Sequence, residues 1–271
     1  MKLQHFGLVC LGLMVISSAA ALAETRPSVL TATATTITLR ADVWCPYNCE
    51  PSSRDPGYMV EIARSVFQPH GLTVSYQTLP WSRTLAEVRA GTIDGAIGAS
   101  IGSPETRGMV FGEEDLGLSQ SVFAVTRGSP RVASIADLAT RTLVAIADYS
   151  YGDPFDSYIE THRRDSKRVS LLSGDDVTKR LIRLVLSGRA DVLIEDVAVL
   201  RFEAAQVDGG DRLETSPAGE PVRIGIAFTN ARPEGQRYAA LLDAGVRQMR
   251  ADGRLAAILA RYGVPDWRVG Q

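Results

Sequence analysis

The sequence is short of cysteine, histidine, long apolar runs and excess charge of one sign. It has three cysteines and three histidines among 271 residues, which disfavours a structural zinc site with its four ligands. Its one marked apolar run, residues 8–16, is too short to span a bilayer, and no later segment is apolar enough. Basic and acidic residues nearly balance, 29 against 31, which argues against nucleic acid as the main partner. We expect no cofactor.

The first residues have the layout of a secretory signal peptide. A short basic start, Met1-Lys2, precedes the apolar run, and Ala21-Leu22-Ala23 supplies small residues at the two positions that a signal peptidase reads. We therefore expect residues 1–23 to be a cleaved signal peptide and the protein to be periplasmic, with an uncleaved anchor helix as the alternative. The remaining chain is long enough for two domains of ordinary size.

Cleavage at this position would leave two cysteines, Cys45 and Cys49. An oxidising compartment favours a disulfide between them, closing a short local loop. Two free thiols are the alternative. A metal pair is less favoured, because His70 and His162 do not lie at finger spacing from the cysteines.

Strand and helix patterns alternate along the chain, which implies an α/β sheet. Apolar residues recur at every second position in the expected strands and at helical spacing in the expected helices. The order begins with strand 37–43, helix 59–67, strand 72–76, a helix with Pro80 at its first position and Gly91 after its end, and strand 93–97.

One junction recurs later in the chain. Residues 88–97 and 185–194 each read as a helix end, a glycine and an aspartate that begins an apolar strand. The second copy belongs to a further unit, with a capping box at 134–137, strand 142–147 and helix 177–185. A loop over 216–221, strand 222–228 and two amphipathic helices follow. This weak repeat favours two lobes built on related α/β units.

Six segments in order resemble the bacterial extracellular solute-binding proteins of the polar amino-acid class, which serve ABC transporters. The resemblance covers nearly the whole chain after the signal peptide and rests on ordered motifs. They are Asp42-Val43-Trp44-Cys45-Pro46-Tyr47, the start of a helix at 57–62, the strand at 91–97, Ser103-Pro104-Glu105-Thr106-Arg107, the strand at 190–198 with Glu195-Asp196, and the terminal segment 252–263.

The resemblance implies a periplasmic-binding-protein-like fold, with two α/β lobes joined by a two-strand hinge and a ligand cleft between them. Lobe 1 would take residues 36–126 and 225–271, and lobe 2 residues 127–224. The chain would cross between the lobes near 125–126 and near 224–225. The implied function is capture of a small polar amino acid or related organic acid for an ABC permease in the inner membrane, by a protein that is a monomer.

The resemblance also implies ligand contacts. Arg107 matches the arginine that binds the ligand carboxylate, and Asp196 matches the acid that binds the ligand ammonium; such charge-assisted hydrogen bonds contribute about 1.5–3 kcal/mol each. Trp44 matches a stacking aromatic, and Ser100 and Ser150 match hydroxyl residues. A solvated surface arginine at Arg107 and a helix cap at Asp196 are the alternatives.

The segment Pro80-Trp81-Ser82-Arg83 departs from the better-known amino-acid binders, as does Gly102, where a hydroxyl residue is common. Trp81 could form a second pocket wall and Arg83 could meet a second anionic group of the ligand. These departures leave the identity of the ligand open.

Two other functions share this fold. A periplasmic sensory or accessory module would bind a solute or partner without transport. A dehydratase-like enzyme would need a general acid or base in the cleft, for which Asp148, Glu195 or Asp196 are the candidates. We expect no enzyme, because the sequence shows no nucleophile paired with a histidine and no metal cluster.

Overall fold

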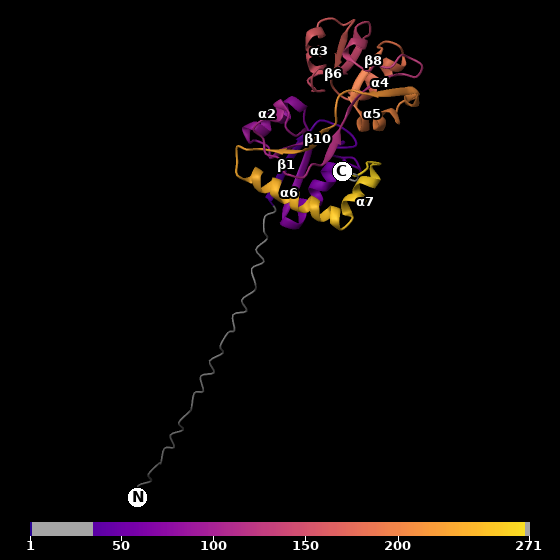
Figure 1. Ribbon diagram of the computed structural model, residues 1–271. Coiled ribbons are helices and arrows are strands. Elements are labelled where there is room, and N and C mark those ends of the chain that lie inside the picture. Colours follow the sequence, from indigo (N-terminus) through magenta and orange to yellow (C-terminus); the bar gives the residue numbers. More distant parts are fainter. Residues whose placement is uncertain (2–34, 269–271) are drawn as a thin grey trace. The chain divides into compact units, whose positions relative to one another are not determined.

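Two separate five-stranded sheets organise the chain (Figure 1). The computed structural model describes Met1 and residues 35–268, so residues 2–23 of the expected signal peptide lie outside the described residues. No helix in this described part is long and apolar enough to cross a membrane.

The first sheet has the strand order β2-β1-β3-β10-β4. We call this sheet with its helices the first lobe. Its strands are β1 (Thr35–Ala41), β2 (Leu72–Thr78), β3 (Gly95–Ser100), β4 (Gly117–Ser119) and β10 (Val222–Phe228). Its helices are α1 (Tyr58–Phe67), α2 (Trp81–Ala90), α6 (Glu234–Ala251) and α7 (Arg254–Arg261).

The second sheet has the order β7-β6-β8-β5-β9, and with its helices it forms the second lobe. Its strands are β5 (Ser121–Thr126), β6 (Leu143–Ile146), β7 (Val169–Leu172), β8 (Val192–Asp196) and β9 (Leu213–Pro217). Its helices are α3 (Phe155–His162), α4 (Val177–Leu186) and α5 (Val197–Ala204).

The two sheets have the same construction. In each, three strands pair in parallel, β2-β1-β3 and β7-β6-β8. The remaining pairings are antiparallel: β3-β10 and β10-β4 in the first sheet, and β8-β5 and β5-β9 in the second. The repeated junction has a matching contact: Asp94 accepts the backbone N–H of Thr38 at 2.7 Å, and Asp191 accepts that of Thr142 at 2.8 Å. The sequence echo therefore marks equivalent places in two related units.

The chain passes from one sheet to the other twice in its described part. The first passage is at Gln120, between β4 and β5, and the second is over residues 218–221, between β9 and β10. The passages that the sequence suggested, near 125–126 and 224–225, fall inside β5 and β10 in this structure. Both crossings thus lie a few residues earlier in the chain.

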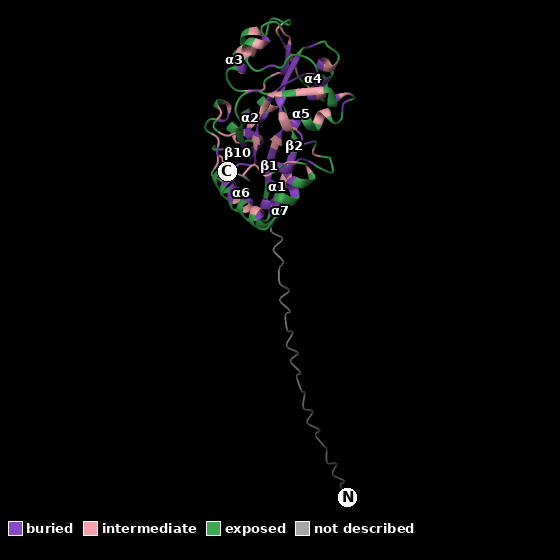
Figure 2. Ribbon diagram, turned by 45° about the vertical axis from the view of Figure 1, so that its right-hand side comes forward, coloured by how far each residue is buried: buried purple, intermediate pink, exposed green. Residues whose placement is uncertain are grey.

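Apolar side chains of the strands and helices form the cores of the two lobes, and the strands are largely buried (Figure 2). In the first lobe, β1 turns Ile37, Leu39 and Ala41 towards a core that α1, α6 and α7 cover. Helix α2 closes the opposite face with Leu85 and Val88. The second lobe has one core beneath α4 and α5 and another that includes Phe155 of α3.

Most expected elements are present, with small shifts at their ends. The helix expected to have Pro80 at its first position begins at Trp81 instead, so Pro80 is its N-cap. Gly91 ends this helix with a positive φ of 72°, a conformation that glycine adopts at little cost. The capping box at Ser134 and Asp137 is formed.

Candidate functional site

A disulfide-closed loop follows the first strand. Cys45 and Cys49 are paired, as expected. Next to the disulfide, the backbone of Trp44 pairs with that of Asn48 through two hydrogen bonds of 2.7 and 3.1 Å. The carbonyls of Pro46 and Tyr47 accept the first N–H groups of α1, from Tyr58 and Met59, at 3.0 Å each. The loop is therefore fixed against the helix, and it presents its aromatic side chains in a defined orientation.

The two aromatic side chains of this loop stack on each other. The ring centroids of Trp44 and Tyr47 are 4.3 Å apart. Beneath them, β3 has a bulge at Gly98, whose φ is 79°. A Cβ atom at this position would lie 3.2 Å from the Trp44 ring and 3.0 Å from Asn48 Oδ1. The glycine thus allows the loop to approach the sheet closely.

Asp196 of the second lobe is the central acceptor of the site. Its side chain is buried, and it caps α5 by accepting the N–H groups of Ala198 and Val199 at 2.8 and 3.0 Å. From the first lobe, the Tyr47 hydroxyl donates to it at 3.1 Å. The Ser119 hydroxyl and the Gln120 N–H donate to its Oδ2 at 2.8 and 3.0 Å. Both carboxylate oxygens therefore have protein donors.

Glu195 is buried next to it and also contacts the first lobe. Its carboxylate accepts the Asp196 N–H at 2.7 Å, the Thr178 hydroxyl at 3.0 Å and, at a long 3.5 Å, the Trp44 Nε1–H. Burial raises the pKa of the Glu195 carboxyl to about 8, against the lowering effect of these donors. The structure thus favours a proton on this residue near neutral pH.

A third carboxylate lies at the end of β1. Asp42 accepts a hydrogen bond from the Tyr149 hydroxyl, which comes from the segment after β6. Burial raises the pKa of Asp42 to about 6, although this hydrogen bond opposes the shift. We call this group the junction cluster; it consists of Asp42, Trp44, Tyr47, Tyr149, Glu195 and Asp196.

The electrostatics of the junction cluster are unusual for three neighbouring carboxylates. In the described part of the chain, no lysine or arginine forms an ion pair with Asp42, Glu195 or Asp196. All the donors that join the lobes here are neutral hydroxyl, indole or backbone groups. Neutral donors hold a carboxylate less strongly than a cation does, so an incoming ammonium group could replace them at a gain.

Three residues of the first lobe that are expected to contact the ligand are Arg107, Arg83 and Trp81, and both arginines lie at the surface. Arg107 follows a short 3-10 turn, is exposed, and has no hydrogen bond from its side chain to any described residue. Arg83 is also exposed and pairs with Glu87 one turn along α2, at 2.9 Å. Trp81 is half-buried at the start of the same helix and packs on the core beneath it.

The two expected serines have different surroundings. Ser100 is half-buried at the end of β3, opposite Ile224 of β10. Ser150 is exposed, and its hydroxyl donates to Asp156 at 2.6 Å. Two surface cavities of about 420 Å³ lie on the second lobe, and neither is lined by a residue expected to bind the ligand.

The sequence assigned no role in the site to Tyr47, Tyr149, Asp42 or Ser119, although Asp42 and Tyr47 belong to the first of the six motifs. Asp42 and Tyr149 follow the carboxyl ends of β1 and β6, and these ends of parallel strands are where α/β sheets place their sites. That positional signal was present. Ser119 lies in a three-residue strand without a pattern of its own, so only the structure reveals it.

This architecture defines a class of protein: two α/β lobes of like topology, joined by two chain crossings, with polar side chains meeting where the lobes touch. It is the periplasmic-binding-protein-like fold. The sequence matches the family model of bacterial extracellular solute-binding proteins, family 3, over residues 38–265, and the chain belongs to that family.

Solved structures share the fold at low sequence identity. A protein of glutathione import in Streptococcus mutans is 18% identical with a TM-score of 0.69, covering 86% of this chain and 98% of its own. A mutant of the arginine-binding protein ArgBP from T. maritima is 18% identical with a TM-score of 0.67, covering 84% and 94%. A histidine kinase sensor domain is 21% identical with a TM-score of 0.67, covering 84% and 95%. The chain has no significant match among curated proteins.

Proposed function

We propose that this protein captures a small polar, amino-acid-like solute in the periplasm and delivers it to an ABC transporter. The observation that carries the proposal is the junction cluster, where neutral donors of the first lobe meet buried carboxylates of the second. Family membership supports it, as do structural neighbours named for arginine binding and for glutathione import.

The proposed ligand bridges the two lobes. Its ammonium group binds Asp196 and takes the place of the Tyr47 hydroxyl, so that an ion pair replaces a hydrogen bond from a neutral donor. Its carboxylate binds Arg107, whose guanidinium has no competing ion pair among the described residues. A ligand that contacts both lobes stabilises the closed form relative to the open one, which is the condition for ligand-driven closure.

Five further residues complete the proposed site. Trp44 stacks on the ligand, Ser100 and Ser150 supply hydroxyls, and Trp81 and Arg83 contact the part of the ligand that differs from a simple amino acid. Ser150 would have to turn away from Asp156 to do so. The protein works as a monomer and catalyses no reaction.

Ligand-dependent stabilisation tests the proposal. Each amino acid and a set of small organic acids would be added to the purified protein, and the melting temperature recorded. A ligand at about 100 times its Kd raises the free energy of unfolding by about 2.7 kcal/mol. Native mass spectrometry of protein taken from the periplasm would weigh any molecule that co-purifies. No stabilisation by any of these compounds would count against the proposal.

A matched pair of variants tests the assigned arginine. Arg107→Ala should abolish the stabilisation, whereas Arg54→Ala, which removes another exposed arginine of the first lobe, should preserve it. If Arg107→Ala still binds, Arg107 does not belong to the site.

A sensory role is the second candidate, and the likeness to a histidine kinase sensor domain favours it. Both roles require ligand binding, so the stabilisation assay does not separate them. Neighbouring genes for a permease and an ATPase would indicate transport, and their absence beside a gene for a sensor kinase would indicate sensing.

A further inference from the structure

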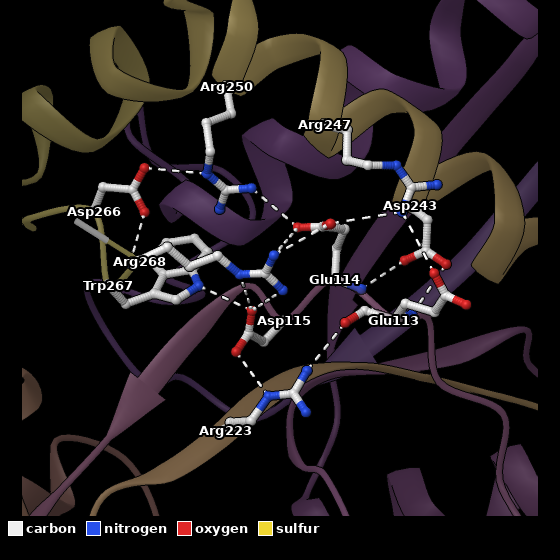
Figure 3. Close-up of polar contacts among 10 residues, drawn as sticks. All are labelled: Glu113, Glu114, Asp115, Arg223, Asp243, Arg247, Arg250, Asp266, Trp267 and Arg268. Atoms are coloured by element: carbon white, nitrogen blue, oxygen red, sulfur yellow. Dashed lines mark hydrogen bonds and ion pairs between the residues drawn. The ribbon is translucent and has the colours of Figure 1, made fainter. Parts of the chain in front are cut away.

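A group of charged side chains surrounds the segment that leads out of the first lobe. Glu114 and Asp115 precede β4, and the side chains of both are only 7% exposed. They contact α6, the returning strand β10 and the C-terminal segment Asp266–Arg268 (Figure 3). Three segments distant in sequence therefore meet at one pair of carboxylates.

Asp115 divides its two oxygens between two of these segments. Its Oδ2 accepts Arg223 Nε of β10 at 2.8 Å. Its Oδ1 accepts Trp267 Nε1 at 3.1 Å and Arg268 Nη2 at 3.1 Å. Although burial alone would raise it, the hydrogen bonds from Arg223 and Trp267 lower the pKa of Asp115. The carboxylate therefore joins the returning strand to the C-terminal segment.

Glu114 reinforces the same connection. It accepts Arg250 Nη1 of α6 at 3.0 Å and pairs with Arg268 Nη1 at 3.1 Å. Arg250 in turn bonds Asp266 at 3.2 Å and lies 5.7 Å from the centre of the Trp267 ring. Arg268 thus spans two buried acids at once with the planar fork of its guanidinium.

The braced segment runs directly into the candidate site. Asp115 is followed by Leu116, whose N–H bonds Ile224 O of β10 at 2.8 Å, and then by β4. At the far end of this short strand, Ser119 and Gln120 donate to Asp196. A shift of the chain at Asp115 would therefore displace the two donors that hold the central carboxylate.

We infer that Arg268 and Trp267 are positioning residues for Asp196: the C-terminal segment clamps Asp115, and through β4 it sets where Ser119 and Gln120 meet the carboxylate. The functional meaning of this clamp rests on the proposed ligand role of Asp196. The mechanical connection itself can be tested without any ligand.

Amide hydrogen exchange, resolved by NMR, measures the connection directly. Arg268→Ala should speed exchange at Leu116 and Gln120 by about tenfold relative to wild type. The same variant should raise the pKa of Asp196 further, because that carboxyl loses donors, and its ¹³C titration reports this. Arg254→Ala is the control, because Arg254 bonds only Asp252 among the described residues.

Two comparisons decide between positioning and general stabilisation. In an Asp115→Asn background, the further change Arg268→Ala should have little additional effect on Gln120, because the contact through which it acts is already weakened. Arg268→Lys keeps the charge without the guanidinium fork, so its exchange rates at Leu116 and Gln120 should lie between those of wild type and Arg268→Ala. This variant also provides the test if the alanine variant does not fold. Exchange that is unchanged, or accelerated equally in β2 and in Leu116–Gln120, would overturn the inference. Failure of the ligand screen would leave this result intact.

Discussion

Replacing Glu195 with glutamine should remove a specific pH dependence from the stability of the protein. The glutamine keeps the size of the side chain and an oxygen that can accept the Asp196 N–H. The Thr178 hydroxyl, which donates to Glu195, can rotate and accept from the glutamine amide instead. What the glutamine loses is the ability to titrate. The comparison therefore isolates the proton that burial holds on Glu195.

The direction of this pH dependence follows from which state of the protein, folded or unfolded, holds the proton. The pKa of Glu195 is raised from an ordinary 4.5 to about 8 in the folded protein. Between these values the unfolded chain has released the proton and the folded protein keeps it, so the free energy of unfolding falls as pH rises. The slope is about 1.4 kcal/mol per pH unit, or about 3 kcal/mol from about pH 5 to about pH 7.5. Below pH 4.5 the effect vanishes.

Denaturant titrations at several pH values measure this difference. Wild type, Glu195→Gln and Glu160→Gln would be unfolded in parallel; Glu160 is an exposed residue of α3 paired with Arg163. The gap between Glu195→Gln and wild type should widen in favour of the variant as pH rises, while the control should follow wild type. A gap that stays constant with pH would show that Glu195 does not hold the proton and would refute the reasoning.

Three further predictions concern stability. Asp94→Asn should lower the free energy of unfolding by about 2 kcal/mol, because the aspartate accepts two hydrogen bonds from Thr38 and pairs with Arg232. Asp191→Asn, at the more exposed equivalent site, should lower it by well under half as much. Denaturant midpoints of the two variants should differ accordingly. Gly245→Ala should destabilise by about 1–3 kcal/mol despite better helix propensity, because its Cβ would lie 2.5 Å from the side chain of Val66; equal or higher melting temperature would contradict this. Replacing both disulfide cysteines by serine should cost about 2 kcal/mol through the entropy of a short closed loop, measured as a lower melting temperature.

The sequence predicted the architecture because that architecture depends on local signals. The alternation of β1, the helical spacing of α1 and the glycine after α2 each act within about ten residues. The repeated aspartate was also a local signal, and Asp94 and Asp191 do make the same contact in the two sheets. The passage between the sheets has no such signal, because β4 and β5 are separated by a single residue and follow one another as one extended segment.

The site was harder to predict because its contacts join distant segments. Asp196 was recognisable as an acid that ends an apolar strand. Its partners Tyr47 and Ser119 are 149 and 77 positions away in sequence, and nothing local in a tyrosine or serine indicates such a role. Asp196 does cap the following helix, which is one of the two roles that the sequence left open, and this cap fixes the orientation of its carboxylate.

The chain contains two groups of buried carboxylates, and they differ in whether arginines pair with them. Glu114 and Asp115 face several guanidinium groups. Burial opposes the shift, but hydrogen bonds from Arg223 and Trp267 lower the pKa of Asp115. The carboxyls of the junction cluster have only neutral donors, and burial raises the pKa of each. A carboxylate already paired with arginine gains little from another cation, whereas one held by a tyrosine hydroxyl gains much. Four arginines, Arg223, Arg247, Arg250 and Arg268, pair with Glu114 or Asp115. Among the described residues, the charges of Glu114 and Asp115 are thus compensated by arginines, whereas the carboxyls of the junction cluster have no cationic partner.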